Sequence, residues 1–200
     1  MGIAMNKVEQ NKQKKKDIIL ATAKSVFLNE GYVAANMDNI AKKSQITKQT
    51  IYRYFPSKLA LFTATLHSLS EDFDQSFTEH LQHPDAEHAL LGFAKAFVAL
   101  HLSEQHIDTC RLLIAEGRSA PEIIATFHEV GEDDMDSQLI TFFQQRLGIE
   151  QPQTTIKLWT GMLLSLRMGV LLGMASPNDK EVEQHAITAT TFLLNGLKHS

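Results

Sequence analysis

The segment that decides the fold is "NMDNIAKKSQITKQTIYRYFPSK", residues 36–58, which carries the signals of two short helices. Asn36 can cap a first helix, in which apolar residues recur at helical spacing. Thr47 can cap a second helix at 48–55, and Pro56 ends it because proline disfavours helical geometry in the residue before it. Two short helices joined by about four residues are typical of a helix-turn-helix, here at about 37–56.

The second of these helices is expected to have two different faces, because successive residues turn by about 100°. The polar face is formed by Lys48, Gln49, Tyr52 and Arg53. The opposite side is formed by Ile51 and Phe55, with much of Thr50 and Tyr54. One face is therefore available to read DNA while the other anchors the helix.

The residue types on and beside the polar face suit contacts with nucleic acid. Gln49 can pair with adenine and Arg53 with guanine, each through two hydrogen bonds. Lys48 and Lys58 can neutralise phosphates, and tyrosine hydroxyls can donate to phosphate oxygens. For the two tyrosines, the alternative is that their rings only fasten this helix to its neighbours.

The charge of the chain is unevenly distributed. Residues 1–58 hold eleven Lys or Arg against four Asp or Glu, whereas the whole chain has a net charge of −4. A basic first quarter followed by an acidic body predicts that the first part meets a polyanion. The alternative is a solvated lysine-rich tail.

The rest of the chain has the pattern of consecutive helices without strands. The hydrophobic fraction of 44 % and the five prolines favour a globular, all-α protein. Gly31 follows a first helical pattern and can take the left-handed conformation at its end. The pattern predicts nine helices, at about 14–29, 37–43, 48–55, 58–80, 85–103, 107–118, 121–147, 154–175 and 180–198.

The longer stretch "GYVAANMDNIAKKSQITKQTIYRYFPSKLALF", residues 31–62, resembles the DNA-binding domain of the tetracycline-repressor (TetR) family of bacterial transcriptional regulators. The positions that fit the family pattern are Gly31, Tyr32, Ile40, Ala41, Ile46, Thr47, Ile51, Tyr52, Tyr54, Phe55, Lys58 and Leu61. The departures are Ser44 for alanine, Asn36 as a less usual cap, and Gln45 and Gln49 where the family often has glycine. A left-handed Gln45 would be strained by about 1 kcal/mol. A second stretch, "RLLIAEGRSAPEIIATFHEVG", resembles the effector domains of one subgroup.

This resemblance implies a three-helix DNA-binding head at residues 14–62 and a helical effector-binding and dimerisation domain at 63–200. It also implies a homodimer whose two reading helices enter successive major grooves of a pseudo-palindromic operator. The residues that would touch DNA are Lys48, Gln49, Thr50, Tyr52, Arg53, Tyr54 and Lys58. The function implied is that of a transcriptional regulator, most commonly a repressor, released from its operator by a small effector.

The expected second domain offers candidates for the effector pocket and for the dimer interface. The pocket candidates are Phe93, Phe97, His101, Cys110, Phe127, Trp159 and Met162, for which the alternative is plain core. The prevalence of Phe, Leu and Met favours an apolar or amphipathic effector. Gly161, Gly169 and Gly173 would let the last two helices approach those of a second copy, and the alternative is an ordinary core within one domain.

Other classes of function find little support in the sequence. His80, His83 and His88 do not have the spacing of a zinc site and favour a solvated turn, and no phosphate-binding, cofactor or catalytic motif is found. One cysteine, no signal-like start and no membrane-length apolar run suggest the cytoplasm and no membrane partner. The alternative to an effector-controlled regulator is an architectural or protein-recruiting DNA-binding factor of the same fold.

Overall fold

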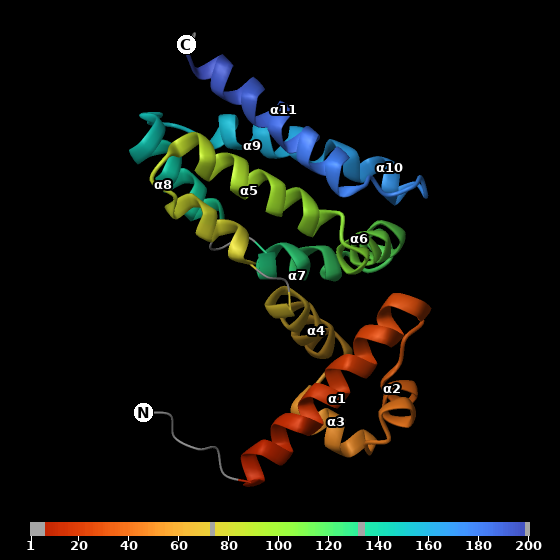
Figure 1. Ribbon diagram of the computed structural model, residues 1–200. Helices are drawn as coiled ribbons and strands as arrows, with labels where there is room; N and C mark the ends of the chain where they lie inside the picture. Colours follow the sequence, from red (N-terminus) through yellow and green to blue (C-terminus); the bar gives the residue numbers. More distant parts are fainter. Residues whose placement is uncertain (1–6, 73–74, 132–134, 199–200) are drawn as a thin grey trace. The chain divides into compact units, whose positions relative to one another are not determined.

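The computed structural model describes residues 7–72, 75–131 and 135–198, and every regular element in these ranges is a helix (Figure 1). The helices are α1 (Lys7–Glu30), α2 (Met37–Ser44), α3 (Lys48–Tyr54), α4 (Lys58–Asp72), the 3-10 helix η1 (Gln75–Gln82), α5 (Ala86–His101), α6 (Glu104–Glu116), α7 (Pro121–Gly131), α8 (Met135–Leu147), α9 (Gln153–Leu163), the 3-10 helix η2 (Leu164–Leu166), α10 (Arg167–Leu171) and α11 (Asp179–Leu197).

The chain forms two compact units, and neither is one continuous stretch of sequence. Unit 1 consists of Met1–Asp72 and Leu112–Gly131, whereas unit 2 consists of Phe73–Arg111 and Glu132–Ser200. This division by packing differs from the predicted division by function, which has a single boundary after residue 62. That functional boundary stays a prediction.

Unit 1 is organised around three aromatic rings at the end of α1. Phe27, Tyr32 and Phe62 pack with ring centroids 5.0 to 5.8 Å apart, so α1, the following loop and α4 share one core. Gly31 ends α1 with φ of +84°, where a side chain would be strained. A Cβ there would also lie 2.2 Å from the carboxylate of Glu116, so that side chain would have to move to make room for it.

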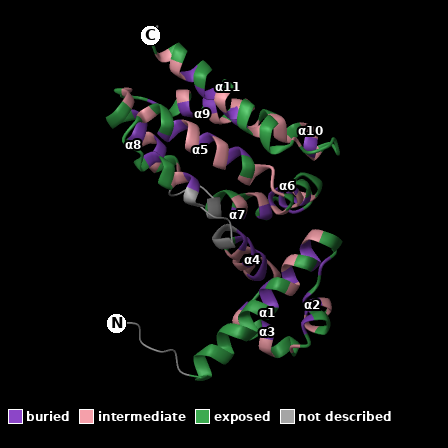
Figure 2. Cartoon of the chain, viewed as in Figure 1, coloured by how far each residue is buried: buried purple, intermediate pink, exposed green. Residues whose placement is uncertain are grey.

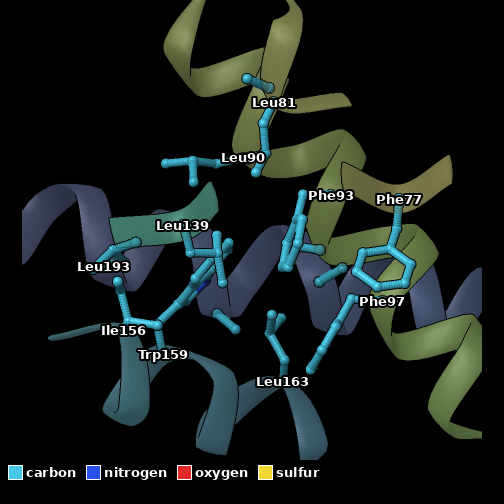
Figure 3. Packing of buried hydrophobic residues seen from close by; sticks show 14 of the residues in the cluster. Phe77, Leu81, Leu90, Phe93, Phe97, Leu139, Ile156, Trp159, Leu163 and Leu193 are labelled. Atoms are coloured by element: carbon cyan, nitrogen blue, oxygen red, sulfur yellow. The ribbon is translucent and has the colours of Figure 1, made fainter. Parts of the chain in front are cut away.

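Unit 2 has its own core, in which α5 packs against η1, α9 and α11. Trp159 of α9 is fully buried and lies close to Phe93 (Figure 3), with 5.5 Å between the ring centroids. The distance between the ring centroids of Trp159 and Phe143 is 5.9 Å. Figure 2 shows buried residues along the inward sides of these helices. The indole Nε1–H of Trp159 has no hydrogen-bond acceptor in the part of the chain that the structure describes.

The all-α prediction is confirmed, and the described residues contain eleven α-helices where about nine were expected. Within the predicted helix at 121–147 the structure describes α7 up to Gly131 and α8 from Met135, and residues 132–134 lie outside the described residues. The predicted helix at 154–175 is two helices separated by η2. At the second break, His185 Nε2–H donates to the carbonyl oxygens of Met162 at 2.9 Å and Leu163 at 3.2 Å. A side chain that binds helix carbonyls in this way is a common cause of a break.

Two histidines at the junction of α5 and α6 are held in an apolar environment. The ring of His101 packs 4.0 Å from Phe97 and 4.6 Å from His106, and its Nδ1–H donates to the Phe97 carbonyl at 2.7 Å. Burial lowers the pKa of His101 to about 4 and that of His106 to about 3, and the positive charge of Arg167 adds to both effects. Burial also raises the pKa of the Cys110 thiol nearby. All three groups are therefore uncharged at pH 7.

These depressed pKa values predict an acid-labile fold. The unfolded chain takes up protons at its histidines near pH 6.5, whereas folded His101 and His106 do so only near pH 4 and 3. The contribution of these histidines to the free energy of unfolding is therefore complete above pH 6.5. It decreases as the pH drops, and at pH 5 the loss is about 2 kcal/mol per histidine. Urea unfolding of His106→Gln should show a weaker loss of stability between pH 7.5 and 5 than the wild type. An unchanged pH dependence in His106→Gln, or an equal effect of the exposed-site control His67→Gln, would contradict this.

Candidate nucleic-acid interface

The helix-turn-helix of unit 1 is fixed locally by two N-caps and a left-handed turn. Asn36 Oδ1 accepts the Asn39 amide hydrogen at 2.8 Å, and Thr47 Oγ1 accepts that of Thr50 at 3.3 Å. Between the helices, Gln45 has φ of 57° and ψ of 28°. In this geometry the Ile46 amide donates to the Ala41 carbonyl at 3.2 Å, which closes the end of α2. The turn therefore forms with glutamine where glycine would be less strained.

The two faces of α3 differ in burial as its sequence predicts. Ile51 is fully buried and Phe55, directly after the helix, is 5 % exposed. Lys48, Gln49, Tyr52 and Arg53 are exposed on the opposite face, whereas Thr50 and Tyr54 are half-buried between the two. A row of polar side chains thus lies on a helix that is anchored from behind.

The cations on the exposed face of α3 have weak partners within unit 1. Lys48 forms an exposed ion pair with Asp38 at 2.8 Å, and this hydrogen bond raises the pKa of Lys48. The guanidinium of Arg53 lies 5.7 Å from the ring of Tyr54. Exposed ion pairs of this kind are easily exchanged for another anion. Asp38 therefore occupies a place that a phosphate could take.

Lys58 is used differently from its neighbours. Its ammonium donates to the carbonyl oxygens of Tyr32, Val33 and Ala35 at 2.8, 3.1 and 3.0 Å, and it lies 4.6 Å from the Tyr32 ring centroid. An ammonium has three hydrogens to donate, so these carbonyls can engage them all. The structure gives Lys58 a role in holding the loop between α1 and α2, and its predicted phosphate contact stays a prediction.

Two carboxylates that sequence reasoning missed also hold this loop and α2. Glu116 accepts the Val33 amide hydrogen at 2.7 Å, across 83 positions of sequence, so no local signal identifies it. Glu30 accepts from Lys43 at 2.6 Å and from Asn39, and the bond from Lys43 lowers the Glu30 pKa. A carboxylate in the last turn of a helix is unfavourable unless it is paired. The position of Glu30 in the last turn of α1 is therefore a sign, visible in the sequence, that its carboxylate has a cationic partner.

The predicted effector residues fall into both units. Phe93, Phe97 and Trp159 form part of the unit 2 core (Figure 3), and His101 and Cys110 lie near its α5–α6 end. Met162 packs against the same core, whereas Phe127 belongs to unit 1. Two hollows described in unit 2, of about 310 and 260 Å³, are lined by other residues of η1, α8 and α9. The effector pocket stays a prediction.

The predicted dimer glycines lie beside exposed apolar side chains of unit 2. A Cβ at Gly161 or Gly173 would meet no atom within 4 Å, and one at Gly169 would meet Met174 Sδ at 3.2 Å. The exposed apolar residues on and next to α9, α10 and α11 are Leu158, Met168, Leu172, Met174 and Phe192, each at least 61 % exposed. A sizeable apolar area is therefore uncovered in the single chain.

In the described ranges 7–72, 75–131 and 135–198, no group of three or more His, Cys, Asp or Glu side chains could hold a metal ion. The Asp85 carboxylate caps α5 and binds His88 Nδ1 at 2.8 Å, which places His88 in a turn network. No helix in these ranges is long and apolar enough to cross a membrane.

Comparison with known proteins gives matches to both parts of the chain. Residues 19–65 match the family model of bacterial regulatory proteins of the tetR family. Residues 88–196 match the C-terminal domain of AefR-like transcriptional repressors. The second match alone spans more than half of the chain.

Individual relatives agree with these models. The transcriptional activator FasR of Mycolicibacterium smegmatis is 44 % identical over 48 residues, which are 24 % of this chain and 22 % of FasR. The transcriptional repressor NemR of Escherichia coli K12 is 23 % identical over 166 residues, covering 75 % of this chain and 82 % of NemR.

Solved structures show the same fold. A TetR-family regulator from Mesorhizobium loti has a TM-score of 0.78 and 23 % identity, covering 92 % of this chain and 96 % of its own. The flavonoid-responsive regulator FrrA has a TM-score of 0.76 and 25 % identity, covering 92 % of this chain and 97 % of its own.

The carbonyl contacts of Lys58 predict that its loss destabilises unit 1. Lys58→Ala should lower the free energy of unfolding by about 1 to 3 kcal/mol, because three carbonyls lose a charged donor. Urea denaturation measures this loss, and Lys42→Ala, at an exposed lysine of α2, serves as the control. A Lys58→Ala variant of wild-type stability that binds every duplex more weakly would instead establish Lys58 as a phosphate contact.

Proposed function

Because the chain belongs to the TetR family of DNA-binding transcriptional regulators, we propose that it is a sequence-specific repressor that a small ligand releases from its operator. The observation that carries this proposal is the exposed polar face of α3 above buried Ile51 and Phe55. A helix fixed on one side and polar on the other can enter a major groove without losing its register. Repression is favoured by the AefR-like repressor model and by NemR, whereas the activator FasR matches only over 48 residues.

Each residue on this face has a defined chemical task in the proposal. Gln49, whose side chain makes no hydrogen bond to another described residue, pairs with an adenine, and Arg53 pairs with a guanine. Lys48 exchanges Asp38 for a phosphate. The hydroxyls of Thr50, Tyr52 and Tyr54 position the helix against phosphate oxygens, which sets its register without reading sequence.

The operator is proposed to be read by a homodimer. TetR regulators bind DNA operators and typically form homodimers. The exposed apolar residues of α9, α10 and α11, with the open space outside Gly161 and Gly173, support an interface at these helices. A twofold pair places two α3 helices about 34 to 36 Å apart, so a pseudo-palindromic operator is expected.

The proposed ligand is apolar or amphipathic. The core of unit 2 is rich in Phe and Leu, and the buried Trp159 Nε1–H would gain an acceptor from a ligand with a polar oxygen. The relative FrrA is named for its response to flavonoids, which are amphipathic. The second candidate, a DNA-binding architectural factor without a ligand, is favoured by the dense packing around Trp159. No catalytic role is proposed for the chain.

The reading of DNA by α3 predicts separate effects on specific and random DNA. Selection from a random duplex pool should first yield a pseudo-palindromic operator. Gln49→Ala should then cost about 1 to 3 kcal/mol per half-site on that operator, with little change on random duplex or in the salt dependence. Fluorescence anisotropy measures both affinities. Equal weakening on operator and random duplex would contradict the placement of Gln49 against a base.

The proposed ligand response predicts coupled binding. A flavonoid that binds unit 2 should change the fluorescence of Trp159, the single tryptophan, and weaken operator binding by about 5- to 150-fold. The operator should weaken ligand binding by the same factor. A ligand that alters Trp159 fluorescence without changing operator affinity would oppose this coupling, and a broad panel without any binder would favour the architectural factor.

A further inference from the structure

The first turns of α1 are exposed on all sides of the helix. Every residue from Lys7 to Ile18 is exposed, and burial begins only at Ile19. Figure 1 shows these turns projecting from the packed part of unit 1, and Figure 2 shows them exposed. We call residues 7–18 the basic arm. At about 1.5 Å per residue the basic arm is roughly 18 Å long.

The basic arm is strongly cationic and its lysines are not paired. It carries Lys7, Lys12, Lys14, Lys15 and Lys16 against Glu9 and Asp17. None of the five lysines has a hydrogen bond or ion pair to another residue that the structure describes, and Asp17 accepts from Gln13 at 2.7 Å. Lys12 and Lys16, four positions apart, repel each other on the helix surface. A helix with this composition gains stability when an anionic partner covers it.

The distribution of side chains selects the kind of anionic partner. At about 100° per residue, Lys12, Lys15 and Lys16 span one side of the helix, whereas Lys7 and Lys14 lie on another. The exposed apolar residues Val8 and Ile18 are too few to form the broad apolar face that inserts into a lipid surface. Charge on several sides without an apolar stripe suits a phosphate backbone, which is polyanionic along its whole length.

We propose that the basic arm is a second DNA-contacting surface, which binds phosphates flanking the half-site read by α3. This inference rests on the proposed function, because it assumes that unit 1 binds DNA. With a rise of about 3.4 Å per base pair, a contact of roughly 18 Å covers about five base pairs. The arm contributes affinity and salt dependence and reads no base, since lysine–phosphate contacts carry no sequence information.

The test compares two triple variants of the full-length protein. Lys12, Lys15 and Lys16 are replaced by glutamine, which keeps helix propensity and removes three charges per chain. The control variant replaces Lys157, Lys180 and Lys198, which are exposed in unit 2, in the same way. It therefore changes the net charge by the same amount as the arm variant. Each protein is titrated against the selected operator with and without ten-base-pair flanks and against random duplex, between about 50 and 200 mM salt.

The arm variant should bind the flanked operator about tenfold more weakly or worse at low salt, with its salt slope reduced by up to about 5 for six lost contacts in a dimer. The affinity of the arm variant for random duplex should fall in parallel. The flanks should raise the operator affinity of the wild type but not that of the arm variant. If the arm and control variants have equal salt slopes and unchanged stability to urea, the basic arm does not contact DNA, and the proposed function stays intact. A wild type that binds no duplex would overturn the proposed function itself.

Discussion

The positions of α2 and α3 in unit 1 depend on three hydrogen bonds that the Lys58 ammonium donates to the carbonyl oxygens of Tyr32, Val33 and Ala35. These carbonyls belong to the loop that ends at Asn36, the N-cap of α2. The position of α2 follows from that loop, and the position of α3 follows from the left-handed turn at Gln45. The loop between α1 and α2, and with it the start of α2, is thus held by the charged donor Lys58.

Local signals in the sequence were sufficient for the helix-turn-helix. Caps such as Asn36, and the burial of Ile51 opposite Gln49, depend on residues within one or two turns, so periodicity and capping rules identify them. Long-range contacts were not accessible in the same way. Glu116 meets a backbone amide 83 positions away, and His185 binds carbonyls at a helix break where hydrophobic periodicity continues unchanged. The placement of Phe127 in unit 1 likewise follows from packing alone.

The two units present opposite chemistry to their surroundings. Unit 1 exposes cations on α1 and α3, of which Lys48 has only a surface ion pair. Unit 2 exposes apolar side chains such as Leu172 and Phe192, at 76 % and 73 % of their full accessibility. Contacts of the first kind weaken with salt, whereas contacts of the second kind do not. If copies associate through these apolar side chains as proposed, ionic strength should act on DNA binding while leaving that association nearly unchanged.

Unit 1 is interrupted in the sequence, since α7 packs against α4 and Ile123 is fully buried in this unit. The first 72 residues leave the ribosome well before the segment from Leu112 to Gly131 that completes their core. Vectorial synthesis normally lets an N-terminal domain finish folding before its successor is made. Here residues 73–111 of unit 2 emerge first, so unit 1 can complete its core only after the segment from Leu112 to Gly131 has been made. The nascent chain carries an incomplete head during that interval, when chaperones have access to its unburied apolar surface.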